Sequence, residues 1–258
     1  VLDYEIGDEM KTDAAFRRAA RVVKLTHYNT RVVASPMEPR ACVATYDAAK
    51  DMHTLYCCSQ GVGNQRTQLA RVTGLPDAKL DVVAGDVGGG FGNRSSLYPE
   101  YCAVLLAAKK LGRAVKWTGT RSEGFLSDDQ ARDSLGTGEL ALDADGRFLA
   151  MRFVFTANIG AYLSLNGANV STRSAMTCIT GVYELPLVYA RAKLAMTNTS
   201  PTAAYRGSGR PITSYILERL VDQAACELGI DPVELRRRNL VPRHKFPYTT
   251  AHGTKYDC

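Results

Sequence analysis

Long apolar runs and metal-binding cysteine patterns are both missing from this sequence. No stretch of about eighteen consecutive apolar residues occurs, so we expect no membrane-spanning helix. No Cys-x-x-Cys pair occurs and no histidine stands at zinc-finger spacing from a cysteine pair, which argues against a zinc finger and against an iron–sulfur cluster held by this segment alone. The odd number and irregular spacing of the cysteines indicate reduced thiols, so we expect a cytoplasmic protein. The cysteines are Cys42, Cys57, Cys58, Cys102, Cys178, Cys226 and Cys258.

Several catalytic signatures are missing as well. The absence of a Gly-Lys-Ser/Thr segment excludes a phosphate-binding P-loop. Neither a Gly-x-Ser-x-Gly motif nor a paired-carboxylate pattern occurs, so hydrolase chemistry has no support. The basic cluster Arg236–Arg238 has no interleaved aromatics and ends a predicted helix, which argues against nucleic-acid binding. The histidines and acids show no metal-ligand spacing, so we expect no metal held by protein side chains.

What remains is the composition of a folded protein. The chain has 258 residues, of which 45% are hydrophobic and 22% charged, enough for one large domain or two of ordinary size. Its net charge of +6 is spread along the chain. The first residues carry neither an initiator Met nor an apolar signal core, and the last residues have no tail-like composition. We expect both ends to be cut points inside a longer protein.

Hydrophobic periodicity and turn residues predict an α+β fold of two similar α/β-layer units, residues 1–131 and 132–258, related by an internal repeat. Gly90-Phe91-Gly92 and Gly207-Ser208-Gly209 each follow a predicted strand and precede a helix that closes at Leu-Gly. Residues 121–138 read largely as polar loop and residues 166–177 as a polar, mobile segment. Strands are predicted at 21–33, 41–46, 53–57, 80–83, 115–120, 139–142, 148–157 and 187–196, and helices at 12–20, 98–111 and 213–228, with others after 63 and 231.

Two glycine-containing loops are candidates for ligand binding. Five glycines fall within Gly85–Gly92, which leaves backbone N–H groups open and permits close approach of an anionic or oxo-bearing group. A tight structural turn is the alternative. In the second loop, Arg206 could bind a phosphate, carboxylate or oxo group, or pair with a structural carboxylate such as Glu218. Gln60 could donate and accept hydrogen bonds, or serve only as a turn residue.

The ordered set of these motifs resembles the large subunit of the molybdenum hydroxylases, which include xanthine dehydrogenase, aldehyde oxidase and carbon monoxide dehydrogenase-like proteins. The resemblance covers nearly the whole chain and corresponds to the first half of the molybdopterin-binding domain. The motifs are Pro36-Met37-Glu38-Pro39-Arg40, Ser59-Gln60, Asp86-Val87-Gly88-Gly89-Gly90-Phe91-Gly92, Ala204-Tyr205-Arg206-Gly207-Ser208-Gly209-Arg210-Pro211, Glu218-Arg219 and Asp231-Pro232-Val233-Glu234-Leu235-Arg236-Arg237-Arg238-Asn239-Leu240.

The resemblance implies a role for each matching position. Gln60 is expected to hydrogen-bond an oxo ligand of molybdenum, and Arg206 and Gly207 to line the cofactor from the second unit. Gln60 and Arg206 are therefore the candidate catalytic residues. The pterin, and no protein side chain, is expected to ligate the metal. The remaining cofactor-binding positions present backbone N–H groups and a ring beside the metal, and are Gly89, Gly90, Phe91 and Gly92.

Departures from the family pattern limit the substrate. Carbon monoxide-oxidising members carry Cys at the position of Gly207, which disfavours that substrate. Purine hydroxylases carry Glu at the position of Ser95, which puts a purine in doubt. The family's catalytic Glu lies in a downstream Gly-x-Gly-Glu segment that this chain lacks.

The resemblance implies a fragment of an oxidoreductase that hydroxylates an aldehyde or N-heterocycle with water and is inactive alone. Its cofactor would be molybdenum–molybdopterin, with the cytosine dinucleotide form as one alternative. Expected partners are the rest of the large subunit, iron–sulfur and FAD domains or subunits, and a small-molecule substrate. Two other hypotheses are a naturally split subunit and a non-catalytic assembly or interaction module.

Overall fold

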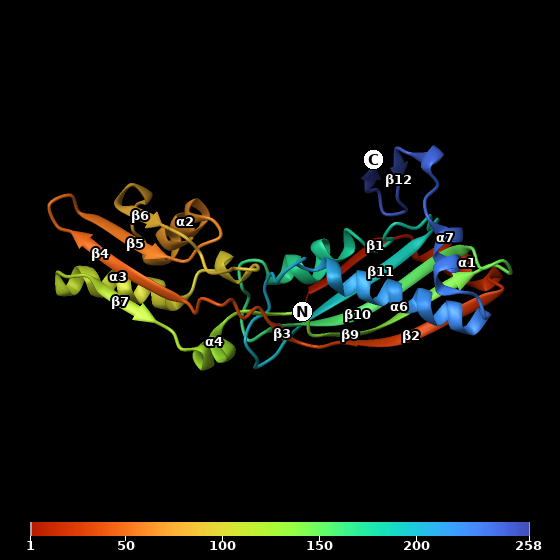
Figure 1. Ribbon diagram of the computed structural model, residues 1–258, viewed down its shortest axis with the longest axis horizontal. Helices are drawn as coiled ribbons and strands as arrows, with labels where there is room; N and C mark the ends of the chain where they lie inside the picture. Colours follow the sequence, from red (N-terminus) through yellow and green to blue (C-terminus); the bar gives the residue numbers. More distant parts are fainter. Residues whose placement is uncertain (1, 258) are drawn as a thin grey trace.

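The computed structural model describes residues 2–257 and has two lobes that lie side by side along its longest axis (Figure 1). The small lobe comprises residues 41–118, and the large lobe is built around a five-stranded sheet. Each lobe has its own hydrophobic core. The α+β class expected from the sequence is confirmed.

The small lobe is a four-stranded sheet packed against two helices. Its strand order is β6-β5-β4-β7, in which β5 and β6 are parallel and the other neighbours antiparallel. Leu55 of the sheet is buried with Leu69, Tyr101 and Leu105 of the two helices. The elements are β4 (Ala41–Asp47), β5 (Met52–Cys57), α2 (Val62–Thr73), β6 (Leu80–Val83), α3 (Pro99–Leu111) and β7 (Val115–Thr118).

The large lobe contains a mixed sheet of order β1-β11-β10-β9-β2. Strands β10 and β11 are parallel, and the other neighbours are antiparallel. The two edge strands both come from the first part of the chain. The strands are β1 (Leu2–Gly7), β2 (Arg21–Asn29), β9 (Ser134–Leu142), β10 (Phe148–Gly160) and β11 (Val188–Met196).

Helix α6 (Arg210–Leu228) packs its apolar stripe into the core of the large lobe. The helix predicted at 213–228 is confirmed, and Ile216, Leu217 and Leu220, which helical spacing places on one face, are all buried. The helix lies so close to β9 at Gly138 that a Cβ added to this glycine would lie 2.7 Å from Cγ1 of Ile216. Helix α1 (Glu9–Arg18) belongs to a separate small cluster, in which Ala15 packs with Ala141 and Ala150.

Short elements make up the rest of the described chain. They are β3 (Val32–Val33), α4 (Arg121–Ser127), β8 (Gln130–Ala131), α5 (Gly167–Asn169), a π-helical turn (Val170–Ser174), α7 (Pro232–Asn239), β12 (Tyr248–Thr249), β13 (Lys255–Tyr256) and 3-10 turns at Asp77–Lys79, Asn93–Ser95 and Arg243–Lys245. Among the helices of the described part of the chain, none is long and apolar enough to cross a membrane.

Three local predictions need correction. The first helix begins after Asp8, whose carboxylate accepts from the Lys11 N–H at 2.9 Å, and not at residues 12–13. The segment expected to be polar loop contains α4, which has a Thr120–Glu123 capping box. The segment 166–177, expected to be mobile, is helical, because Val170 and its neighbours are buried against the large lobe.

The internal repeat is not evident in the structure. Helices α3 and α6 do close alike, at Gly112 and Gly229, which both adopt the left-handed conformation. The two sheets, however, differ in strand number and order. Sheet membership also cuts across the predicted boundary after residue 131, because β1 and β2 pair with β11 and β9.

Candidate functional site

Gln60 holds the first glycine loop through the oxygen of its side chain. This atom, Oε1, accepts hydrogen bonds from the N–H groups of Gly92 at 2.7 Å and Arg94 at 3.1 Å. The Gln60 N–H donates in turn to the Arg94 carbonyl at 3.1 Å. Gln60 therefore does more than form a turn. Its side-chain NH2 group donates to no other residue among those that the structure describes, and it remains available to a ligand.

Two glycines of this loop, Gly88 and Gly90, are required by contacts within the chain. A Cβ at Gly90 would lie 2.5 Å from Oε1 of Gln60, and one at Gly88 would lie 2.5 Å from Cβ of Glu38. The Glu38 carboxylate also accepts from the Gly88 N–H at 2.7 Å. The chain thus packs the loop against Gln60 and Glu38, so part of the glycine requirement is structural.

The two glycine loops, which are far apart in the sequence, meet directly. The Arg206 N–H donates to the carbonyl oxygen of Phe91 at 2.9 Å. Gly92 has a positive φ of 104°, and a Cβ there would lie 2.2 Å from the carbonyl oxygen of Ala204. Phe91 itself has φ 53° and a side chain that remains partly exposed. The structure therefore brings the predicted residues of both loops to one place.

The alternative partner considered for Arg206 is excluded by the position of Glu218. Glu218 pairs with Arg236 at 2.7 Å and accepts from the Tyr183 hydroxyl at 2.8 Å, so it is not the partner of Arg206. Arg206 is exposed, and its guanidinium makes no hydrogen bond or ion pair within residues 2–257. The neighbouring Gly207 is also exposed and has φ 87°.

Arg132 supports the second loop from behind, a role that the sequence did not reveal. Its buried guanidinium donates to the carbonyl oxygens of Ser208 at 2.5 Å and Arg206 at 2.7 Å, with a longer contact to Tyr205 at 3.4 Å. Burial lowers the pKa of Arg132. The residue lies in a segment that sequence reasoning treated as polar loop, and an isolated Arg there carries no distinguishing signal.

A buried ion network lies beneath the first loop. The Arg40 guanidinium donates to Asp128 at 2.5 Å and Glu100 at 2.8 Å, and it lies 3.9 Å from the ring centroid of Tyr98. Arg94, which is also buried, lies 3.5 Å from Asp128. Burial lowers the pKa of Arg40, but the hydrogen bonds to Glu100 and Asp128 outweigh this effect and raise the pKa overall. Arg40 belongs to one of the recognised motifs, but its partners could not be read from the sequence.

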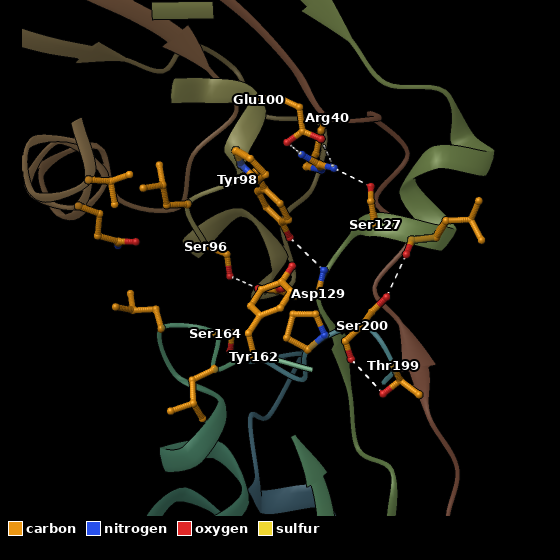
Figure 2. A pocket seen from close by; sticks show the side chains of 18 of the residues that line it. Arg40, Ser96, Tyr98, Glu100, Ser127, Asp129, Tyr162, Ser164, Thr199 and Ser200 are labelled. Carbon is orange, nitrogen blue, oxygen red and sulfur yellow. Dashed lines mark hydrogen bonds and ion pairs between the residues drawn. The ribbon is translucent and has the colours of Figure 1, made fainter. Parts of the chain in front are cut away.

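A cavity of about 700 Å³ lies between the lobes, and its lining is shown in Figure 2. Tyr98 and Ser96 line it from the small lobe, and Tyr162 and Ser164 from the large lobe. Burial raises the pKa of Asp129 in its wall, although a hydrogen bond from Ser96 opposes this. None of the predicted site residues lines this cavity. The candidate site is therefore the meeting of the two loops.

The groups left free at that meeting fit an anionic or oxo-bearing cofactor. Besides the Gln60 NH2 and the Arg206 guanidinium, the N–H groups of Gly90, Phe91 and Gly207 find no acceptor among the residues that the structure describes. All of these groups are hydrogen-bond donors, which suits oxo groups and phosphates. Residues 2–257 contain no group of three or more His, Cys, Asp or Glu side chains that could hold a metal ion.

Comparison with known proteins identifies the family of the chain. Residues 1–240 match the family model described as the molybdopterin cofactor-binding domain. The chain is 36% identical to the carbon monoxide dehydrogenase large chain of Hydrogenophaga pseudoflava, over 100% of this chain and 32% of the relative.

Solved structures show the same fold. The chain superposes on quinoline 2-oxidoreductase from Pseudomonas putida 86 with a TM-score of 0.94 and 36% identity, covering 100% of this chain and 33% of that one. For CO dehydrogenase from Oligotropha carboxidovorans the TM-score is 0.92 and the identity 35%, with 100% and 32% covered. The chain thus spans about a third of the length of these relatives. It belongs to the molybdopterin cofactor-binding domain family of the molybdenum hydroxylases.

Proposed function

We propose that this chain forms one side of the cofactor site of a molybdenum hydroxylase that hydroxylates an aldehyde or an N-heterocycle with oxygen from water. The observation that carries the proposal is the hydrogen bond between Arg206 and Phe91, which gathers unpaired donors from both lobes in one place. The bound cofactor supplies the redox chemistry, while the protein supplies position and electrostatics.

Each residue at the meeting of the loops has a defined task. Gln60 fixes the first loop with its oxygen and offers its NH2 group to the cofactor. The N–H groups of Gly90, Phe91 and Gly207 add fixed donors, and the Arg206 guanidinium adds a permanent positive charge. Donors that are positioned before the reaction stabilise developing negative charge without reorganisation.

The remaining parts of the enzyme lie outside this chain. We propose that the rest of the large subunit completes the cofactor site and supplies the general base, since the downstream Gly-x-Gly-Glu segment is not in this sequence. Electrons would leave through iron–sulfur and flavin groups on partner subunits or domains. We further propose the cytosine dinucleotide form of the pterin.

Gly207 favours an aldehyde or N-heterocycle over carbon monoxide. The carbon monoxide-oxidising relatives are expected to carry Cys at this position, whereas this chain offers no thiol there. The structural similarity to quinoline 2-oxidoreductase is consistent with an aromatic N-heterocycle as substrate.

The proposal is tested on the complete enzyme that contains this chain. Metal analysis should find about one molybdenum per large subunit, and the enzyme should hydroxylate quinoline or an aromatic aldehyde with an artificial electron acceptor. Carbon monoxide should not be oxidised, and the 258-residue chain alone should show no turnover. A complete enzyme without molybdenum and pterin would contradict the proposed function. Turnover by the isolated chain would contradict the proposal that the rest of the large subunit is needed to complete the site.

A further inference from the structure

We propose that Arg132 is a positioning residue that orients the Gly207 N–H toward the cofactor. The inference rests on the proposed function and goes beyond it, because Arg132 is not among the residues that the family motifs point to. The residue lies behind the second loop and donates to three of its backbone carbonyl groups, at Tyr205, Arg206 and Ser208.

The planarity of the peptide bond turns this contact into an orientation. In a trans peptide the C=O and the N–H of the same unit point in opposite directions. Because the Arg206 carbonyl points at Arg132, with an Nη2–O distance of 2.7 Å, the N–H of Gly207 must point away from Arg132. It therefore faces the opposite side of the loop.

The neighbouring peptide units follow the same rule and identify that opposite side. The Tyr205 carbonyl faces Arg132, and the Arg206 N–H of that unit donates to Phe91 at 2.9 Å. The Ser208 carbonyl also faces Arg132, and the Gly209 N–H donates to the Ser174 hydroxyl at 3.2 Å. Of the three N–H groups turned away from Arg132, only that of Gly207 lacks an acceptor among residues 2–257. Arg132 thus fixes the direction of the Gly207 N–H, which remains available to a ligand.

The charge of Arg132 strengthens this donor. Arg132 is 8% exposed and forms no ion pair in the part of the chain that the structure describes. The adjacent Asp133 carboxylate instead pairs with Arg31 at 2.9 Å and accepts from Asn158 at 2.8 Å. Among the described residues, the guanidinium charge is therefore faced by carbonyl dipoles and by the ring of Tyr205, whose centroid lies 5.3 Å from Cζ, and by no carboxylate partner. It polarises the peptide units that it contacts, and it leaves a positive potential in the loop that favours an anionic ligand.

The backbone at Arg132 is shaped to bring the side chain inward. Arg132 and Asp133 both have left-handed conformations, with φ 68° and 65°, which non-glycine residues adopt only where the surroundings impose them. The flanking backbone is fixed on both sides. The Gln130 N–H donates to Pro201 at 2.9 Å, and the Asn158 N–H donates to the Asp133 carbonyl at 3.0 Å. This anchored turn places the guanidinium behind the second loop.

The test uses Arg132→Gln and Arg132→Lys in the complete enzyme, with Arg31→Gln as the matched control. Arg31 is a nearby arginine that binds Asp133 and the Ser200 carbonyl, but it makes no contact with residues 205–208. For each variant, molybdenum and pterin are measured per folded molecule, together with the melting temperature. Pterin is read as the fluorescence of its oxidised form after denaturation, which does not depend on turnover.

Arg132→Gln should lower the affinity for the cofactor by about 10- to 100-fold. Losses of this size are typical when a residue is removed that orients the groups in direct contact with a metal centre. Arg132→Lys should be impaired similarly, because a single ammonium cannot span the carbonyls that the planar guanidinium bridges. Arg31→Gln should lower the melting temperature and keep the cofactor. Full cofactor retention by Arg132→Lys would overturn this inference. So would a loss of cofactor that follows the fall in melting temperature equally in the Arg31 and Arg132 variants. Either result would leave the proposed function standing. A parent enzyme without cofactor would overturn the proposed function as well.

Discussion

The backbone N–H of Arg206 lies 2.9 Å from the carbonyl oxygen of Phe91, and this contact joins the loops of the two lobes. Because both groups belong to the backbone, the contact fixes the relative position of the loops whatever their side chains do. A Cβ added at Gly92 would lie only 2.2 Å from the carbonyl oxygen of Ala204, so the loops already approach as closely as glycine allows. The hydrogen-bond donors of the two loops are thus held in a fixed position relative to one another.

Gln60 has two separable functions, and two substitutions should distinguish them. Gln60→Glu keeps an oxygen that can accept from Gly92 and Arg94, but it removes the NH2 donor. In the complete enzyme, kcat should fall by about 10²–10³-fold in both Gln60→Glu and Gln60→Ala, with molybdenum content nearly unchanged in Gln60→Glu. Steady-state kinetics and metal analysis provide the measurements. Normal turnover by Gln60→Glu would show that only the loop-holding oxygen matters.

Gly90 and Gln60 should be coupled energetically. A Cβ at Gly90 would lie 2.5 Å from Oε1 of Gln60, so Gly90→Ala should displace the Gln60 side chain and lower kcat much as Gln60→Ala does. The double variant should be no slower than the worse single variant, because truncating Gln60 removes the clash. Gly63→Ala is the matched control, since nothing lies within 4 Å of its added Cβ and its turnover should be unchanged. Additive losses in the double variant would contradict the coupling.

The ion network beneath the first loop should contribute strongly to stability. Arg40→Met leaves the buried Asp128 carboxylate without its 2.5 Å partner, and breaking a buried pair typically costs about 3–5 kcal/mol. Lys109→Met, which breaks an exposed pair with Asp51, should cost less than about 1 kcal/mol. Urea denaturation of the purified chain measures both free energies of unfolding. Equal effects of the two substitutions would mean that the Arg40 network is not a stabilising one.

Buried histidine should make the large lobe sensitive to acid. His27 is 3% exposed beside Phe153, its two ring nitrogens have no hydrogen-bond partner among the described residues, and burial lowers its pKa from 6.5. Below pH 6.5 the imidazole of His27 therefore takes up a proton more readily in the unfolded state than in the folded state. The contribution of neutral His27 to the free energy of unfolding is present above pH 6.5 and is lost as the pH falls through the pKa of the folded state.

The His27→Leu variant should therefore show a shallower loss of unfolding free energy between about pH 7 and about pH 5. His244→Leu, at an exposed position, is the control and should keep the slope of the parent. Urea denaturation at several pH values provides the slopes. A slope in His27→Leu as steep as that of the parent would rule out His27 as a source of acid sensitivity.

Local signals explain most of what the sequence predicted. The turn between the strands predicted at 139–142 and 148–157, where Gly146 has φ 81°, and the apolar spacing of the helix predicted at 213–228 each depend on neighbours within a few residues. Helix α7 likewise follows its Asp231 cap, whose carboxylate accepts from the Val233 N–H at 3.0 Å. Such features can be read along the chain because the interactions that cause them are local.

What could not be predicted depends on partners distant in the sequence. Motif resemblance brought Gln60, Phe91 and Arg206 together as candidates, but not the geometry of their contacts. Arg132 was missed because its role is defined only by the carbonyls of a loop that folds back onto it. The membership of β1 and β2 in the large sheet was missed for the same reason, since their partners lie in the second half of the chain.

The placement of β1 has a consequence for the order of folding during synthesis. Leu2 pairs with Leu194, so the first strand cannot be completed until β11 has left the ribosome. The small lobe, by contrast, is closed by contacts within residues 41–118 and can form while the rest is still being made. Within this chain, the edge strands β1 and β2 are therefore synthesised before the strands they pair with, and the small lobe lies between them in the sequence.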